Sequence, residues 1–71
     1  MLIFHDWPEP LPIGVEMWAT LDHQCSYTIA CVGGVYSASW SPLDRHAVCE
    51  VKNLLSFEDA VRVLQARANA H

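Results

Sequence analysis

Apolar and polar residues alternate along the middle of the chain, and the alternation changes phase at Gly33-Gly34. The large apolar side chains occupy odd positions over residues 25–32 and even positions over residues 35–40. A period of two is typical of a β-strand with one apolar face. A two-residue turn at the glycines brings both apolar stripes to one face of a hairpin. The predicted opposite pairs are Cys31 with Tyr36, Ile29 with Ala38 and Tyr27 with Trp40.

A further strand is predicted over residues 15–21, which alternate with the same period. A three-residue loop at 22–24 would place Leu21 opposite Cys25, so that apolar residues again face apolar ones. Glu16, Trp18 and Thr20 then lie on the other face of the sheet. Because one helix covers only one face, we expect that face to meet solvent, a partner or the N-terminal segment.

Both flanks of this sheet carry weaker strand signals. Residues 47–51 alternate after a Pro-containing loop and predict a fourth strand at an edge. The apolar run 2–4 offers one more edge strand. Between residues 2–4 and the predicted strand 15–21, residues 7–12 hold three prolines at alternate positions, which favours an extended connector. We expect Trp7 to stack on the fold, and Trp7 or Leu11 to be the residues that would cover Trp18.

A helix is predicted to follow Ser56, which is a good N-cap. Glu58 and Asp59 suit the positive end of the helix dipole, and Glu58 is spaced to pair with Arg62. Apolar residues recur at helical spacing and predict one narrow stripe that covers the sheet. These residues are Phe57, Ala60, Val61, Leu64 and Ala68.

The predicted fold class is therefore α+β, with a small antiparallel meander of three to four strands and one C-terminal helix on one face. A chain of 71 residues suits a single domain. We divide residues 1–71 into an extended Pro-rich segment (1–14), the antiparallel sheet (15–51) and the helix (56–70).

Charge is distributed unevenly along the chain. The first 44 residues carry five acidic and no basic side chains, whereas the rest carry a slight basic excess, and the net charge is −4. Nucleic-acid binding by direct phosphate contact needs a cluster of cations, and the sequence has none. A protein partner with a basic surface is the charged partner that this distribution favours.

The sequence shows no signal for a membrane protein or an exported one. The longest uncharged stretch, residues 23–43, contains glycines and a proline and does not suit a membrane-spanning helix. No basic region precedes an apolar run near residue 1. We therefore expect a cytoplasmic protein without a membrane partner.

Three cysteines raise the question of a disulfide or a metal site. Cys25 and Cys31 lie too far apart in one strand to bond to each other, and Cys49 lies two strands from Cys31. Zinc ligands would have to come from His23 with Cys25 and from His46 with Cys49, but these side chains do not converge. We expect buried thiols, no metal and no cofactor, and keep a metal- or thiol-dependent protein as an alternative.

No pattern of residues predicts an enzyme. The chain has no nucleophile elbow, glycine-rich phosphate loop or paired-carboxylate spacing. In size, acidity and lack of a catalytic motif it is similar to small phage-borne inhibitors of host defence, such as anti-CRISPR proteins. The resemblance implies an inhibitor of a larger protein or complex.

We therefore predict a non-enzymatic protein-binding module with Trp18 as its anchor, since exposed aromatic residues dominate binding surfaces. The other predicted contact residues lie beside Trp18 on the predicted free face or in the adjoining loop, and they are Glu16, Asp22, Thr28, Ser37 and Ser39. The alternative from another class is a structural homodimer formed through the outer sheet face or through edge strands, with Trp18, Val32, Val35 and Val48 in the contact.

Overall fold

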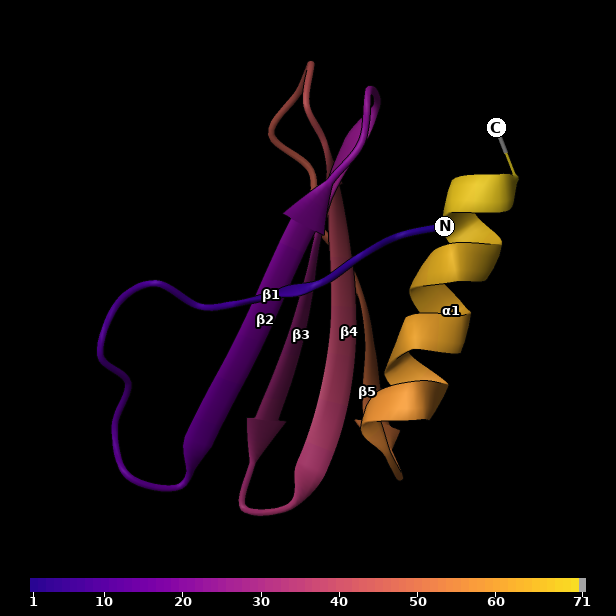
Figure 1. Cartoon of the computed structure of the whole chain (residues 1–71). Helices are drawn as coiled ribbons and strands as arrows, with labels where there is room; N and C mark the ends of the chain where they lie inside the picture. The colour runs from indigo at the N-terminus through magenta and orange to yellow at the C-terminus, as the bar shows by residue number, and fades with distance from the viewer. Residues whose placement is uncertain (71) are drawn as a thin grey trace.

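The structure, a computed structural model, describes residues 1–70. Its elements are β1 (His5–Asp6), β2 (Val15–Leu21), β3 (Cys25–Val32), β4 (Val35–Pro42), β5 (Cys49–Leu54) and α1 (Phe57–Asn69). The strands form one antiparallel sheet in the order β1-β2-β3-β4-β5, with α1 on one face (Figure 1). The predicted α+β fold is confirmed, although the sheet has five strands. We call the face under α1 the inner face and the opposite one the outer face.

The hairpin of β3 and β4 forms the centre of the sheet. Gly33 and Gly34 have φ angles of 58° and 82°, which side chains rarely adopt and which two-residue hairpin turns require. The register pairs Cys31 with Tyr36, Ile29 with Ala38 and Tyr27 with Trp40, as predicted. The apolar stripes of both strands therefore lie together on the inner face.

The two edges of the sheet differ in detail from the prediction. β1 forms at His5–Asp6 and not at residues 2–4, and β5 covers Cys49–Leu54 and not 47–51. β5 pairs Val51 with Ala38 but Leu54 with Tyr36, so two of its residues lie opposite one residue of β4. This β-bulge includes Asn53, whose φ of 61° is accessible to asparagine at little strain.

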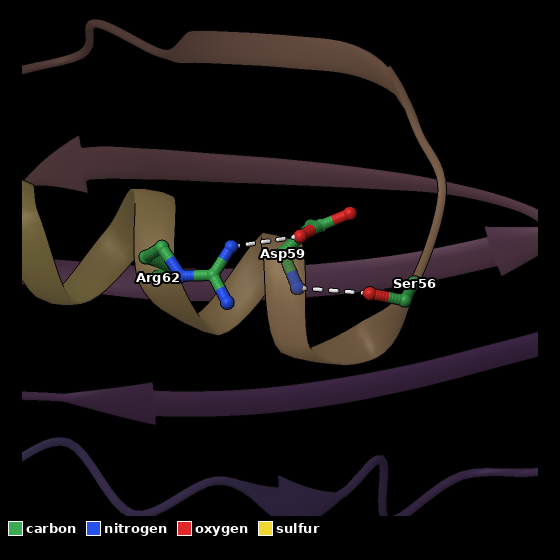
Figure 2. Close-up of polar contacts among 3 residues, drawn as sticks. All are labelled: Ser56, Asp59 and Arg62. Atoms are coloured by element: carbon green, nitrogen blue, oxygen red, sulfur yellow. Dashed lines mark hydrogen bonds and ion pairs between the residues drawn. The ribbon is translucent and has the colours of Figure 1, made fainter.

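α1 begins after Ser56, whose hydroxyl accepts a hydrogen bond from the Asp59 amide at 3.1 Å (Figure 2). The cap satisfies one of the unpaired amides of the first turn. Arg62 forms its ion pair with Asp59, at 2.9 Å, and not with Glu58 as predicted. Side chains three residues apart also come together on a helix, as those four residues apart do. The predicted partner, Glu58, was therefore wrong, and Asp59 is the acidic residue that pairs with Arg62.

The core lies between α1 and the inner face. Its buried residues are Cys25, Tyr27, Ile29, Ala38, Ala60 and Leu64. The N-terminal segment closes one side of this layer, because the ring of Phe4 meets that of Phe57 edge-on at 6.3 Å. The Leu2 amide also donates to Gln65 Oε1 of α1 at 2.7 Å, which holds residues 1–4 beside the helix (Figure 1). No helix within residues 1–70 is long and apolar enough to span a membrane.

Candidate functional site

Trp18 lies on the inner face of the sheet, which corrects the prediction that it lies on the free face. β2 pairs with β3 so that Trp18 is opposite Ile29 and Thr20 is opposite Tyr27. Directly opposed residues share a face, so the indole lies on the side of α1. Its ring centroid is 4.8 Å from that of Phe57 in an edge-on contact, and the ring stacks on Tyr36 at 6.4 Å.

The turn between β2 and β3 causes this one-residue shift. Asp22 Oδ1 accepts hydrogen bonds from the amides of Gln24 and Cys25, at 2.8 and 2.9 Å. The Asp22 amide donates to the Cys25 carbonyl at 3.0 Å. Asp22 therefore lies opposite Cys25, and two residues separate them where the prediction had a three-residue loop. A shift of one residue moves every side chain of a strand to the other face.

The six predicted contact residues consequently do not form one surface. Thr28, Ser37 and Ser39 lie on the outer face as predicted, and all three are half-buried. Glu16 lies on the inner face opposite Cys31, and Asp22 organises the turn. In their place β2 presents its apolar stripe to the outer face, where Leu21 is 67% exposed.

A hollow of about 250 Å³ opens at the β2 edge of the sheet, where β1 ends and the proline segment leaves it. Trp18 and Glu16 line it, together with Asp6, Trp7 and Leu11 of the N-terminal segment. The remaining lining residues are Val15 and Met17. The structure therefore brings two predicted contact residues, Trp18 and Glu16, together with five residues outside the predicted contact set.

Two backbone contacts position the N-terminal side of this hollow. Asp6 of β1 pairs with Trp18 of β2, which sets the Asp6 carboxylate on the same face as the indole. The Trp7 amide donates to the Met17 carbonyl at 3.0 Å, so the chain follows β2 for one more residue before the prolines begin. Trp7 is half-buried, as expected for a residue that stacks on the fold.

Trp7 also lines a second hollow, of about 550 Å³. This hollow has more apolar walls, to which Ala19 and Leu21 contribute, and it is also lined by His5, Thr20, Ser26, Tyr27 and Thr28. We call the two hollows, which share Trp7, the Trp7 surface. It consists of Asp6, Trp7, Leu11, Glu16, Trp18, Ala19, Leu21 and Thr28.

The charge of the first hollow has one sign. Asp6 and Glu16 are exposed, and the side chains that line this hollow include no lysine, arginine or histidine. Tyr36 does not line the hollow, but the Trp18 ring stacks on it. A hydrogen bond with Cys31 raises the pKa of Tyr36, and the charge of Cys31, burial and the charge of Glu16 act in the same direction. Tyr36 therefore stays protonated and neutral at pH 7. Indole faces and carboxylates together provide the environment that a guanidinium or ammonium group prefers.

The buried phenol of Tyr27 organises the turn, although Tyr27 also lines the second hollow. Its hydroxyl donates to Asp22 Oδ2 at 2.7 Å. Burial raises the pKa of Tyr27 well above its ordinary value, and the hydrogen bond to the Asp22 carboxylate adds to the shift. The hydroxyl is thus a permanent donor that holds the turn against the core.

The other candidate groups are dispersed. All three cysteines are free thiols; Cys25 and Cys31 are buried as predicted, whereas Cys49 is exposed, because α1 does not cover this end of β5, and the prediction that it is buried was wrong. Within residues 1–70, no three His, Cys, Asp or Glu side chains are placed to hold a metal ion. A third hollow, of about 270 Å³, is lined by His23, Arg45 and Arg67, but Asp44 also lines it and pairs with Arg45 at 3.4 Å.

No protein-family model, curated protein or solved structure matches this chain. The proposals below are supported by its own geometry.

Proposed function

We propose that this chain is a non-enzymatic protein-binding module that docks a basic partner surface on the Trp7 surface. The observation that carries the proposal is the first hollow, which is lined by two carboxylate residues, Asp6 and Glu16, and by both Trp7 and Trp18, with no lysine, arginine or histidine in the lining. A binding role of this kind suits an inhibitor of a larger protein in the cytoplasm, as small anti-CRISPR-like proteins are.

The expected ligand group is an arginine side chain of the partner. A guanidinium is planar and weakly hydrated, so it can lie against Trp7 or Trp18 while its N–H groups meet Asp6 or Glu16. An exposed cation–π contact contributes about 0.5–1 kcal/mol. Each exposed ion pair adds about 0.2–1 kcal/mol. One arginine alone is therefore a weak ligand, and the second hollow must contribute.

The second hollow supplies the apolar part of the contact. Leu21 and Ala19 would cover an apolar side chain next to the arginine, and the Thr28 hydroxyl can exchange hydrogen bonds with the partner backbone. Trp7 lines both hollows, so it would contact both groups of the partner. A large aromatic residue flanked by an apolar and a charged contact is typical of the centre of a protein interface.

Binding of short peptides tests the proposal directly. One peptide carries arginine and leucine two residues apart, and its control carries citrulline, which has the same shape without the charge. We expect the arginine peptide to shift the NMR signals of the Trp7 and Trp18 indole N–H groups, while the signal of Trp40, on β4, stays in place. Citrulline should remove the shift.

Two charge-neutralising variants locate the effect. Asp6→Asn and Glu16→Gln should each weaken peptide binding by up to about fivefold, because each removes one ion pair. Glu58→Gln, an equal charge change on α1, serves as the matched control and should leave binding unchanged. Equal binding of the arginine and citrulline peptides, or equal loss in the Glu58 control, would contradict the proposal.

A further inference from the structure

The outer edge of β5 carries backbone groups without a partner strand. β5 is the last strand of the sheet, and no strand within residues 1–70 pairs with its outer edge. Val32 and Val35 close the two-residue turn, where opposed residues exchange both hydrogen bonds. The alternation along β4 then directs the backbone groups of Ala38 and Trp40 toward β5.

The same alternation decides which groups of β5 are free. Val51 and Cys49 pair with Ala38 and Trp40, so their N–H and C=O groups point into the sheet. The N–H and C=O groups of Glu50 therefore point outward, away from β4, and we expect the same of Lys52, the residue at which the bulge begins. These two residues offer a short ladder for another strand.

The side chains along this edge alternate in a specific pattern. Glu50 and Lys52 both lie on the outer face and both are exposed, and Lys52 Nζ is 3.6 Å from Glu50 Oε1. Val51 lies between them on the inner face and is half-buried. Cys49 also lies on the inner face but remains exposed, so α1 does not cover this end of β5.

We propose that β5 pairs with β5 of a second copy of this chain, antiparallel and about a two-fold axis through Val51. Glu50 of one copy then lies opposite Lys52 of the other, and the same pair recurs on the other side of the axis. Each such pair exchanges two backbone hydrogen bonds and joins opposite charges on one face. The two Val51 side chains meet on the inner face.

The charges of β5 select this register over its neighbours. An axis through Glu50 places two glutamates opposite each other, and an axis through Lys52 places two lysines opposite each other; both arrangements are unfavourable. An axis through Cys49 pairs neither charge with its opposite. Only the axis through Val51 joins Glu50 to Lys52 twice, because the two charges of opposite sign are placed symmetrically about it.

Charged residues on an edge strand usually discourage pairing with unrelated strands. Here the alternation of sign makes β5 complementary to itself, so the same charges that repel other edges favour a second copy. The bulge at Lys52 and Asn53 ends the regular part of the strand and limits the ladder to a few residues. An isologous pair is the form expected for such a contact.

This dimer leaves the Trp7 surface free. The Trp7 surface lies at the β2 edge, and β5 lies at the opposite end of the strand order. Opposed residues share a face, so both helices lie on one side of the joined sheet. The dimer does not depend on the proposed function, and it would carry two docking surfaces.

Charge-swapped variants test the register. Sedimentation over a range of concentrations should show a monomer–dimer equilibrium for the natural chain. Glu50→Lys and Lys52→Glu should each raise the dissociation constant at least about tenfold, because each puts like charges opposite each other twice. The two variants mixed in equal amounts should form a heterodimer, since each charge again meets its opposite. The double swap in one chain should restore the homodimer.

A disulfide gives an independent measurement. Residue 51 lies opposite itself at a non-hydrogen-bonded position, where the Cα atoms of opposed residues are closest. Val51→Cys, with Cys49→Ser to remove the neighbouring thiol, should therefore form a cross-linked dimer under mild oxidation. Glu50→Cys in the same background is the matched control and should remain uncross-linked.

Three results would overturn the proposal. These are a monomer at every concentration, a dimer whose dissociation constant is unchanged by either charge variant, and cross-linking of Glu50→Cys as fast as that of Val51→Cys. None of them affects the peptide-binding test at Asp6 and Glu16, so failure of the dimer and failure of the docking surface are distinguishable.

Discussion

Removal of the Asp22 side chain should destabilise the protein more than any other change at an exposed loop. Asp22 accepts hydrogen bonds from the amides of Gln24 and Cys25 and from the hydroxyl of Tyr27. Asp22→Ala leaves the Gln24 amide in water, the Cys25 amide partly covered and the Tyr27 hydroxyl inside the core. Hydrogen bonds to a charged acceptor contribute about 1.5–3 kcal/mol each, less where water can replace them.

The magnitude follows from the burial of the three donors. The Tyr27 side chain is 0% exposed, so loss of its acceptor should account for about 2 kcal/mol. The two amides together should add about 1–2 kcal/mol, because the Gln24 amide is exposed. We therefore expect Asp22→Ala to lower the free energy of unfolding by about 3–4 kcal/mol. A chain of this size has a total stability of about 4–10 kcal/mol.

Urea unfolding at pH 7, followed by far-UV circular dichroism and tryptophan fluorescence, measures this loss. Tyr27→Phe removes only the third hydrogen bond and should lose about 1–2 kcal/mol. The double variant Asp22→Ala with Tyr27→Phe should be no less stable than Asp22→Ala alone, since the phenol then has no acceptor to lose. A loss below about 1 kcal/mol in Asp22→Ala, or additive losses in the double variant, would refute this reasoning.

Three further predictions concern the core, the helix cap and alkaline pH. Leu64→Ala should lower the free energy of unfolding by about 2–5 kcal/mol, because Leu64 is fully buried between α1 and the sheet, and calorimetry would show the lower melting temperature. Ser56→Ala should lose about 0.5–2 kcal/mol by removing the cap, while Ser56→Asp should keep most of it. Tyr27 keeps its proton when folded but loses it near pH 10 when unfolded, so stability should be fully present below pH 10. Above pH 10 it should fall by up to about 1.4 kcal/mol per pH unit, and Tyr27→Phe should make the decline less steep in urea titrations.

The parts of the fold that the sequence predicted correctly depend on local signals. Two adjacent glycines fix a two-residue turn, and the stripes on either side of it admit one register, so the central hairpin follows from residues 25–40 alone. Ser56 fixes the start of α1 in the same way. Each signal lies within a few residues of the structure it determines.

The face of β2 could not be predicted because its two candidate registers satisfy different requirements. The predicted register buries the aliphatic stripe and exposes Trp18, whereas the observed one half-buries Trp18 against Phe57 and Tyr36 and exposes Leu21. Aromatic side chains bury the larger area, which favours the observed register. The choice depends on contacts with α1 and β4, and these contacts are far from β2 in the sequence.

The sequence by itself determined the central hairpin, the helix limits and the uneven distribution of charge, because these depend on neighbouring residues and on composition. Only the tertiary structure decided that Trp18 and Glu16 lie beside Asp6 and Trp7, and that they lie on the face opposite to Thr28, Ser37 and Ser39. The physical reason is the turn at Asp22: its side chain needs the buried hydroxyl of Tyr27 as well as the adjacent amides, so one non-adjacent contact helps to set the register of a whole strand.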